Sequence, residues 1–371
     1  MQYRQYGKDG PNVSALGFGA MRFVPRRRGK WGSVNFTRST EVLRRAMAAG
    51  VNFIDSHHFY HGGLSETAVG KALKGWKGRH IHVQTKTPFY QPKPLKYFKG
   101  LIEEALEKLG VNCIDYFLHH SMRMEVFQKR GRLFFKLTDW AMKRGYIRHR
   151  GFSSHDTPEN VRKFVDTGEF SVMLVSYNWL NPAMAETIAY AAGKGMGVSV
   201  MNPVSGGTLA ENTPQIMRLL RGAKSAPEIA LRYVLATPGV TLTLSGMNTV
   251  EQVDENVAVA SRKTAMTPHQ WQVMAERLEQ VRQKGMLICT ACGYCMPCPH
   301  GVDIPGNLAA LSRVRLLGLQ QLARRSYARL ARNRDGDRSA LVCKQCGRCL
   351  PKCPNDFSII DLLAETAEAL G

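Results

Sequence analysis

A (β/α)8 TIM barrel, a fold of the α/β class, is predicted for most of the chain, followed by a small C-terminal cysteine-rich domain. Short apolar segments alternate with amphipathic helical segments over roughly 260 residues, which is the length of such a barrel. Eight of the nine cysteines then follow residue 288. The predicted strands are Leu16–Gly19, Val51–Asp55, His80–Thr85, Cys113–Leu118, Arg148–Ser153, Met173–Tyr177, Gly197–Met201 and Thr241–Ser245.

Helical segments separate these strands, and glycines follow several of them, as helix C-caps prefer. The predicted helices are Ser39–Ala49, Lys96–Leu109, Thr157–Asp166, Ala183–Lys194, Ala226–Ala236, Val250–Ala260 and Pro268–Lys284. A doubly wound sheet also alternates strands and helices, but it normally carries Gly-x-Gly-x-x-Gly after its first strand. The nearest match here, Gly17 to Arg22, lacks the third glycine. The barrel is therefore the favoured fold.

Composition places the chain among ordinary globular proteins. Of 371 residues, 44% are hydrophobic and 22% charged, which argues against disorder and coiled coils. The sequence has no apolar run long enough for a transmembrane helix and no N-terminal secretory signal, so a cytoplasmic location is expected. Lys and Arg number 51 against 29 acidic residues, a net charge of +22. We expect no nucleic-acid partner, because no recognition motif accompanies this charge.

The composition changes near residue 285, which predicts a barrel domain of residues 1–284 and a second domain of residues 285–371. The second domain contains two cysteine motifs, each ending in Cys-Pro: Cys289-x2-Cys292-x2-Cys295-x2-Cys298 and Cys343-x2-Cys346-x2-Cys349-x3-Cys353. Three thiolates at three-residue steps hold one [4Fe–4S] cluster in ferredoxins, and the cysteine before proline reaches the other cluster. The spacing predicts two [4Fe–4S] clusters; two zinc sites, each with four cysteine ligands, are the alternative.

By analogy with two-cluster ferredoxins, each cluster takes three cysteines from one motif and one from the other. Cys289, Cys292, Cys295 and Cys353 would hold one cluster, and Cys343, Cys346, Cys349 and Cys298 the other. The first motif has two residues, not three, before its last cysteine. Cys113 stands apart in an apolar run and is interpreted as a buried structural thiol.

The segment 304–334 between the two motifs contains no Asp or Glu and is rich in arginine. Its arginines are Arg313, Arg315, Arg324, Arg325, Arg329, Arg332 and Arg334, with leucines interleaved. One interpretation is a solvated helix packed on the cluster domain. The other is a docking face, residues 313–334, for an acidic electron-transfer protein, because complementary charge speeds encounter.

Four polar side chains follow predicted strands at the end of the barrel where catalysis occurs. Asp55 ends the second strand, Tyr60 lies five residues later, Lys86 follows the third strand, and His119 and His120 follow the fourth. An Asp–Lys pair beside a tyrosine is expected to lower the pKa of the phenol, which makes it a usable proton donor. A histidine opposite can polarise a carbonyl.

These residues make the sequence resemble the aldo-keto reductases, specifically the branch with a C-terminal ferredoxin-like dicluster domain. The resemblance runs over roughly residues 12–260 and includes Asn52-Phe53-Ile54-Asp55, Gln84-Thr85-Lys86, Ile114 to His120 and Gly151-Phe152-Ser153-Ser154. It implies a catalytic tetrad of Asp55, Tyr60, Lys86 and His120. The family's histidine lies five residues after an aspartate, here Asp115, which selects His120 over His119.

The resemblance also implies a nicotinamide cofactor, NADP(H) or NAD(H). The implied cofactor-binding residues are Ser153, Ser154, Pro203, Gly206, Gly246, Glu255 and Asn256. The sequence departs from the family pattern in three respects. The Lys and Arg that contact the 2′-phosphate of NADP are replaced by Gly246, Met247 and Gln252, and the amide-binding Asn is Ser154. Leu174 stands where a Gln is expected under the nicotinamide.

Three functional interpretations follow. The first is a nicotinamide-linked reductase of a small carbonyl or alcohol substrate, with Tyr60 as general acid and coupled to electron transfer through the clusters. The second is an iron–sulfur oxidoreductase whose barrel binds a flavin or a quinone-like substrate. The third is an electron-transfer subunit or redox sensor with a silent barrel. Hydride transfer moves two electrons while each cluster carries one, and a flavin can split that pair.

Overall fold

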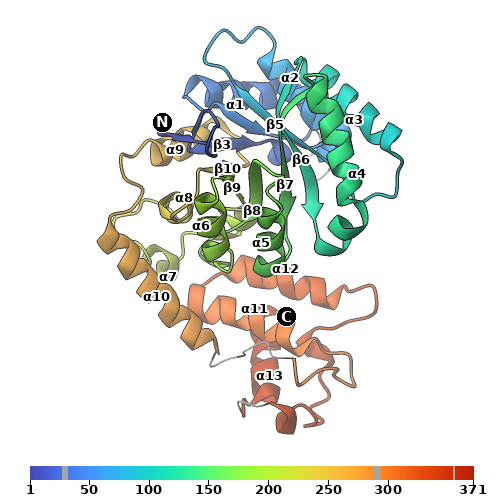
Figure 1. Ribbon diagram of the computed structural model, residues 1–371. Coiled ribbons are helices and arrows are strands. Elements are labelled where there is room, and N and C mark those ends of the chain that lie inside the picture. The colour runs from blue at the N-terminus through green and yellow to red at the C-terminus, as the bar shows by residue number, and fades with distance from the viewer. Residues whose placement is uncertain (27–31, 287–288, 290–292, 354–355) are drawn as a thin grey trace. The chain divides into compact units, whose positions relative to one another are not determined.

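The computed structural model describes residues 1–26, 32–286, 289, 293–353 and 356–371. Within these residues, parallel strands close into the predicted barrel in the order β10-β3-β4-β5-β6-β7-β8-β9. Figure 1 shows helices around these strands. The strands are β3 Leu16–Gly19, β4 Phe53–Asp55, β5 His82–Thr87, β6 Ile114–Met122, β7 Ile147–Ser154, β8 Val172–Ser176, β9 Gly197–Met201 and β10 Leu242–Ser245.

Most helices of this part lie close to the predicted ranges, but Leu64–Leu73, Met124–Lys143 and Pro214–Met217 were not predicted. The helices between the strands are α1 Phe36–Ala48, α2 Leu64–Leu73, α3 Leu95–Leu109, α4 Met124–Lys143, α5 Pro158–Asp166, α6 Ala185–Gly193, α7 Pro214–Met217 and α8 Ala226–Ala236, followed by α9 Val250–Ala260 and α10 Pro268–Met286. Side-chain caps define several starts, as where Thr157 accepts from the backbone N–H of Asn160. Among the described helices, none is long and apolar enough to span a membrane.

An N-terminal hairpin precedes the barrel and was not predicted. Strands β1 Tyr3–Gln5 and β2 Asn12–Ser14 pair antiparallel. Directly after β1, Tyr6 is 1% exposed and packs edge-on against Phe53 and Tyr116 of the barrel core. Its hydroxyl bonds to Ser199 Oγ at 3.0 Å. A Cβ at Gly197 would lie 2.6 Å from the Tyr6 ring. The absence of a side chain at this position therefore leaves room for the ring.

The chain divides into two compact units: Met1–Gly206 with Ala230–Met266, and Gly207–Ile229 with Thr267–Gly371. The second unit thus includes α10 and the segment after β9, in addition to the cysteine-rich tail. Inside this unit Thr213 Oγ1 donates to the carbonyl of Leu317 at 2.7 Å. The boundary predicted at 284/285 marks a change in amino-acid composition. The two compact units are instead defined by which residues contact one another in the structure.

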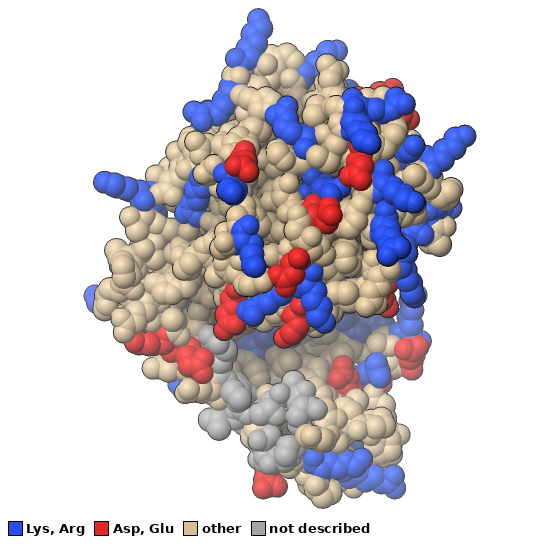
Figure 2. All heavy atoms as spheres, in the orientation of Figure 1, with Lys and Arg blue, Asp and Glu red and all other residues tan. Residues whose placement is uncertain are grey.

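The Arg-rich segment of the second unit forms two helices instead of one. Helix α11, Ile304–Leu317, ends at Gly318 with φ 66°, and α12, Gln320–Ala331, follows. Together with α13, Ile359–Leu370, they bury a small apolar core that includes Ile304, Leu308 and Leu363. On the face shown in Figure 2, Lys and Arg side chains spread over the barrel unit with Asp and Glu among them.

Truncating the Tyr6 side chain tests whether its ring stabilises the barrel core. We expect Tyr6→Ala to lower the free energy of unfolding by about 3–5 kcal/mol, because a buried ring is removed. Tyr6→Phe keeps the ring and loses one buried hydrogen bond, so a loss of about 1 kcal/mol is expected. Urea denaturation followed by far-UV circular dichroism measures both. Equal, small losses for the two variants would show that the ring does not support the barrel.

Candidate active site and cluster-binding residues

The barrel site is built on a buried ion pair at the carboxyl ends of β4 and β5. Lys86 Nζ bonds to Asp55 Oδ1 and also donates to the carbonyl of Ser56 at 2.7 Å. The amide of Gln84 donates to the same Asp55 oxygen at 2.7 Å. Lys86 is 2% and Asp55 4% exposed. The ammonium is therefore held in place by bonds that use two of its three donors.

Tyr60 lies beside this pair at the start of a short 3-10 turn, Tyr60–Gly63. Lys86 Nζ is 5.3 Å from the centre of its ring. Burial and the charge of Asp55 raise the pKa of Tyr60 above its ordinary value. The expected lowering of the Tyr60 pKa is therefore wrong for this arrangement. The phenol keeps its proton at neutral pH, which suits a group that gives a proton to a developing alkoxide.

The two histidines of β6 lie in different surroundings. His119 is fully buried and packs between Phe89 and Phe134. The His120 ring instead lies 4.0 Å from the ring of His57, which is itself 5.0 Å from the Tyr60 ring. The structure thus brings His120, and not His119, to the Tyr60 side of the strand. Burial first, then the charge of Lys86, lowers the pKa of His120 to about 3, so it is neutral at physiological pH.

His57 adds a group that the tetrad does not include. Its Nδ1 accepts a hydrogen bond from the backbone N–H of Phe59 at 3.1 Å. Burial lowers the pKa of His57, so the neutral ring carries its proton on Nε2. The neighbouring His58 is also buried and lies 3.8 Å from the Glu66 carboxylate. These contacts pack the loop that presents Tyr60.

The residues implied for the nicotinamide end offer few free polar groups. Ser154 Oγ donates to the carbonyl of Met122 at 2.8 Å and accepts from the N–H of Asp156. Ser153 Oγ accepts from the N–H of Ser121 at 2.9 Å and keeps its own proton to donate. Leu174 is 1% exposed within the barrel core. Ser153 is therefore the hydroxyl of this group with a donor left over.

The glycine-bearing loops after β9 and β10 converge on Arg22, which sequence reasoning missed. A Cβ at Gly206 would lie 3.2 Å from the Arg22 guanidinium, and one at Gly246 would lie 2.5 Å from its Cγ. Gly206 has φ 67°, and Pro203 in the same loop is buried. A guanidinium beside two glycines, which leave their backbone accessible, fits a diphosphate. Arg22 ends the glycine-containing run Gly17–Arg22, which was the available signal.

The adenine-side residues lie on α9. Asn256 is 9% exposed, and its amide donates to Ser245 Oγ, at the end of β10, at 3.1 Å. Glu255 is exposed to solvent. Arg22 therefore offers the cationic group that fits a diphosphate, while the Asn256 amide is bonded within the protein.

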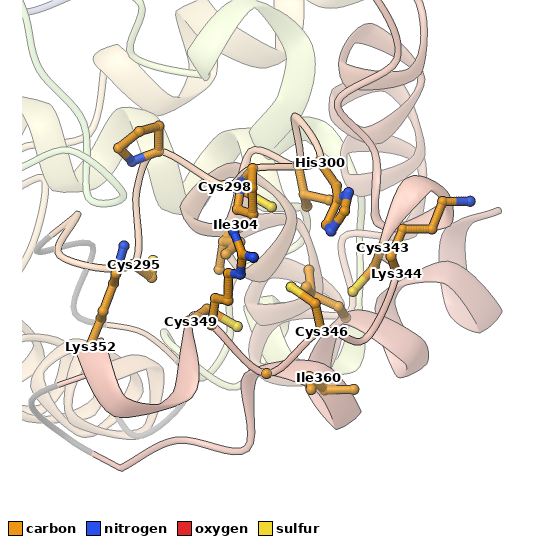
Figure 3. A pocket seen from close by; sticks show the side chains of 16 residues that line it. Cys295, Cys298, His300, Ile304, Cys343, Lys344, Cys346, Cys349, Lys352 and Ile360 are labelled. Carbon is orange, nitrogen blue, oxygen red and sulfur yellow. The ribbon is translucent and has the colours of Figure 1, made fainter.

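The cysteine-rich tail forms a pocket in the second unit. Its lining includes Cys295, Cys298, Cys343, Cys346 and Cys349; Figure 3 shows these thiols around the pocket. Burial raises the pKa of Cys349, and Cys343, Cys346 and Cys298 add to that rise. These four thiols, which are the set expected for one cluster, thus lie close enough to interact.

The loop that carries Cys343, Cys346 and Cys349 curves around the pocket. Gln345 and Gly347 have φ values of 50° and 72°, so the chain curls between successive cysteines. The N–H of Gln345 points to Cys343 Sγ at 3.5 Å, a contact typical of cluster ligands. A soft donor set of four thiols fits a [4Fe–4S] cluster.

The other expected ligand set is described in part. Cys289, Cys295 and Cys353 are partly buried against the small apolar core of the second unit, and Cys292 lies outside the described residues. Cys113 is half-buried in the barrel unit, and burial raises its pKa. It belongs to neither thiol group.

Comparison with known proteins gives matches over both parts. Residues 15–278 match the Aldo/keto reductase family, and residues 288–359 match a 4Fe-4S dicluster domain. An L-galactose dehydrogenase from Arabidopsis thaliana is 26% identical over 70% of this chain and 88% of its own. An NADH-specific methylglyoxal reductase from Escherichia coli is 24% identical over 59% of this chain and 81% of its own. The aldo-keto reductase AKR11C1 from Bacillus halodurans, in its holo form, superposes with a TM-score of 0.64 at 24% identity, over 75% of this chain and 96% of its own.

Metal analysis of cysteine variants tests the ligand set. The wild-type protein, prepared without oxygen, is expected to contain about eight iron and eight sulfide per chain, as two cubane clusters require. Cys346→Ser is expected to lower both to about four, while Cys113→Ser leaves them unchanged. Stoichiometric zinc without sulfide in the wild type, or full iron in Cys346→Ser, would contradict the assignment.

Proposed function

The chain belongs to the aldo/keto reductase family, and on that premise we propose that it is an iron–sulfur oxidoreductase that transfers hydride between a nicotinamide cofactor and a small carbonyl or alcohol substrate. In this proposal Asp55, Tyr60, Lys86 and His120 are the catalytic residues, in a barrel domain of residues 1–284. The observation that carries it is the buried Lys86–Asp55 pair beside Tyr60, with neutral His120 on the same side of the barrel.

Tyr60 acts as the general acid in carbonyl reduction. A nicotinamide bound at this end of the barrel would supply the hydride that the carbonyl carbon accepts. As negative charge develops on the carbonyl oxygen, the Tyr60 hydroxyl gives it a proton. The adjacent Lys86 ammonium then stabilises the phenolate that remains, because charges interact strongly in a dry site. His120 is neutral and donates a hydrogen bond to the same oxygen, which positions it.

The cofactor residues in this proposal are Arg22 with the loops of Pro203–Gly206 and Gly246 at the diphosphate, Ser153 and Ser154 at the nicotinamide, and Glu255 and Asn256 at the adenosine. Met247 and Gln252 bring no cation for a 2′-phosphate. The relative named as NADH-specific supports use of NAD(H) alongside NADP(H). We therefore propose that NADPH is not preferred over NADH by more than about 10-fold, which is about 1.4 kcal/mol.

The clusters of residues 285–371 exchange electrons with an acidic protein in the cytoplasm. A second candidate function has its own support. The Ser154 hydroxyl is bonded within the protein, and Leu174 is apolar. Both features reduce the number of polar groups that could bind a nicotinamide. They favour a barrel that binds a flavin or a quinone-like substrate.

Tyr60→Phe tests the general acid. We expect kcat for carbonyl reduction to fall by about 10²–10⁴-fold, the usual contribution of a positioned proton donor. The matched control is Tyr90→Phe, because Tyr90 is exposed and its ring lies 6.3 Å from His120. Steady-state kinetics measures both. Retained turnover in Tyr60→Phe would remove Tyr60 from the mechanism.

Anaerobic mixing separates the two candidate functions. The iron-loaded protein is mixed with NADH and then with NADPH while the visible absorbance of the clusters is followed. Bleaching by both, at rates within about 10-fold of each other, is expected if a nicotinamide binds without recognition of its 2′-phosphate. If neither cofactor bleaches the clusters but a reduced flavin or quinol does, the second candidate function is supported.

A further inference from the structure

We propose that the cationic rim of the thiol pocket, formed by Lys344, Arg348 and Lys352, is the docking surface for an acidic one-electron redox protein. This inference rests on the proposed function in one respect, that electrons reach the clusters from another protein. It moves the contact from segment 313–334 to the edge of the pocket itself.

Cationic side chains alternate with the ligand cysteines around the pocket. Lys344 lies between Cys343 and Cys346, Arg348 between Cys346 and Cys349, and Lys352 directly before Cys353. All three side chains are exposed and line the pocket. Figure 3 shows Lys344 beside Cys343 and Lys352 on the opposite side, near Cys295. The charges therefore surround the opening.

No carboxylate neutralises this rim among the residues described. The sequence from Arg338 to Cys353 contains no Asp or Glu. The described residues that line the pocket include no acidic side chain either. Fixed positive charges without internal partners attract an anionic surface, and such complementarity raises the association rate.

The surface also has apolar contact area next to the thiols. Leu350 follows Cys349 and is 37% exposed, while Tyr294 precedes Cys295 and is 68% exposed. Cys346 is itself exposed. Transient redox complexes bury little area, at the low end of protein interfaces. A few apolar side chains beside a charged rim suit a transient complex, whose partner dissociates after electron transfer.

The arginines of segment 313–334 are less suited to electron transfer. Arg315 pairs with Glu365 of α13, and Arg313 is partly buried against Ser326. Arg324, Arg325 and Arg329 are exposed on α12, and Arg332 and Arg334 are exposed after its end. None of these five arginines lines the pocket. A partner on α12 would hold its redox centre away from the thiols, whereas electron transfer weakens steeply with distance.

The cysteines inside the rim would hold a [4Fe–4S] cluster, which when bound would accept one electron from the reduced centre of the partner. The partner is oxidised by one electron, no bond forms or breaks, and the partner then dissociates. Two such encounters balance one hydride equivalent at the barrel. The reverse direction uses the same contact.

Charge reversal at two places tests the proposal in the iron-loaded full chain. The test variant is Lys344→Glu/Arg348→Glu/Lys352→Glu, and the matched control is Arg324→Glu/Arg325→Glu/Arg329→Glu on α12. Both change the net charge by the same amount. The probe is a reduced plant-type [2Fe–2S] ferredoxin of net negative charge, mixed anaerobically by stopped flow while the cluster absorbance is recorded.

The rim variant is expected to lower the second-order rate constant by about 10-fold or more and to remove its dependence on ionic strength, because steering is lost. The α12 variant should behave as the wild type. Calorimetric titration with the oxidised probe should show weaker binding for the rim variant alone. If the α12 variant alone loses rate and binding, or if neither variant does, the rim assignment is overturned.

A separate measurement distinguishes failure of the proposed function. Iron and sulfide content and reduction by dithionite are measured in every variant. Wild-type protein without reducible clusters would refute the cluster function and not the position of the rim. Intact clusters that dithionite reduces equally in all variants, together with a rate loss confined to the rim variant, would support the docking surface.

Discussion

The ion pair between Lys86 and Asp55 is the interaction on which the barrel site depends. Its ammonium is buried, and a buried charge is tolerated only when paired and hydrogen-bonded. Asp55, Gln84 and the carbonyl of Ser56 meet that need from β4 and β5 and their ends. Removing one partner of such a pair costs about 3–5 kcal/mol, because the other charge is left uncompensated. The same bonds that protect the charge also fix its distance from Tyr60. Position and stability therefore come from one set of contacts.

Alternation along the strands explains how much of this site the sequence could predict. Side chains two residues apart share one face of a strand. Phe53, Tyr116 and Leu118 fill the barrel core, so Asp55 and His120 continue the inward face beyond that core. His119 takes the outward face and packs with Phe89 and Phe134. The sequence led to Asp55 through its place at a strand end and to His120 through the family's spacing from Asp115, and the alternation of side chains explains why the structure sets His119 apart.

Other features depend on contacts between distant segments and could not be predicted in this way. The pairing of Tyr6 with Ser199 joins residues 193 positions apart. Arg22 gains its place because loops after β9 and β10 lack side chains beside it. The pKa of Tyr60 is raised, whereas the sequence pattern led us to expect a lowered value. The pattern identified its charged neighbours, but burial has the largest effect on its pKa.

The second unit differs from the barrel, because binding of clusters by its cysteines would contribute to its folding. Its apolar core is small and is supplied by short helices, and such domains commonly need a metal or disulfides to fold stably. Ligand binding then supplies part of the folding free energy. The rim residues lie between or beside the ligand cysteines, so cluster ligation would also fix where their charges stand. The cationic side chains would then stand around the redox centre that a partner must reach, so recognition and electron transfer would depend on one set of ligand cysteines.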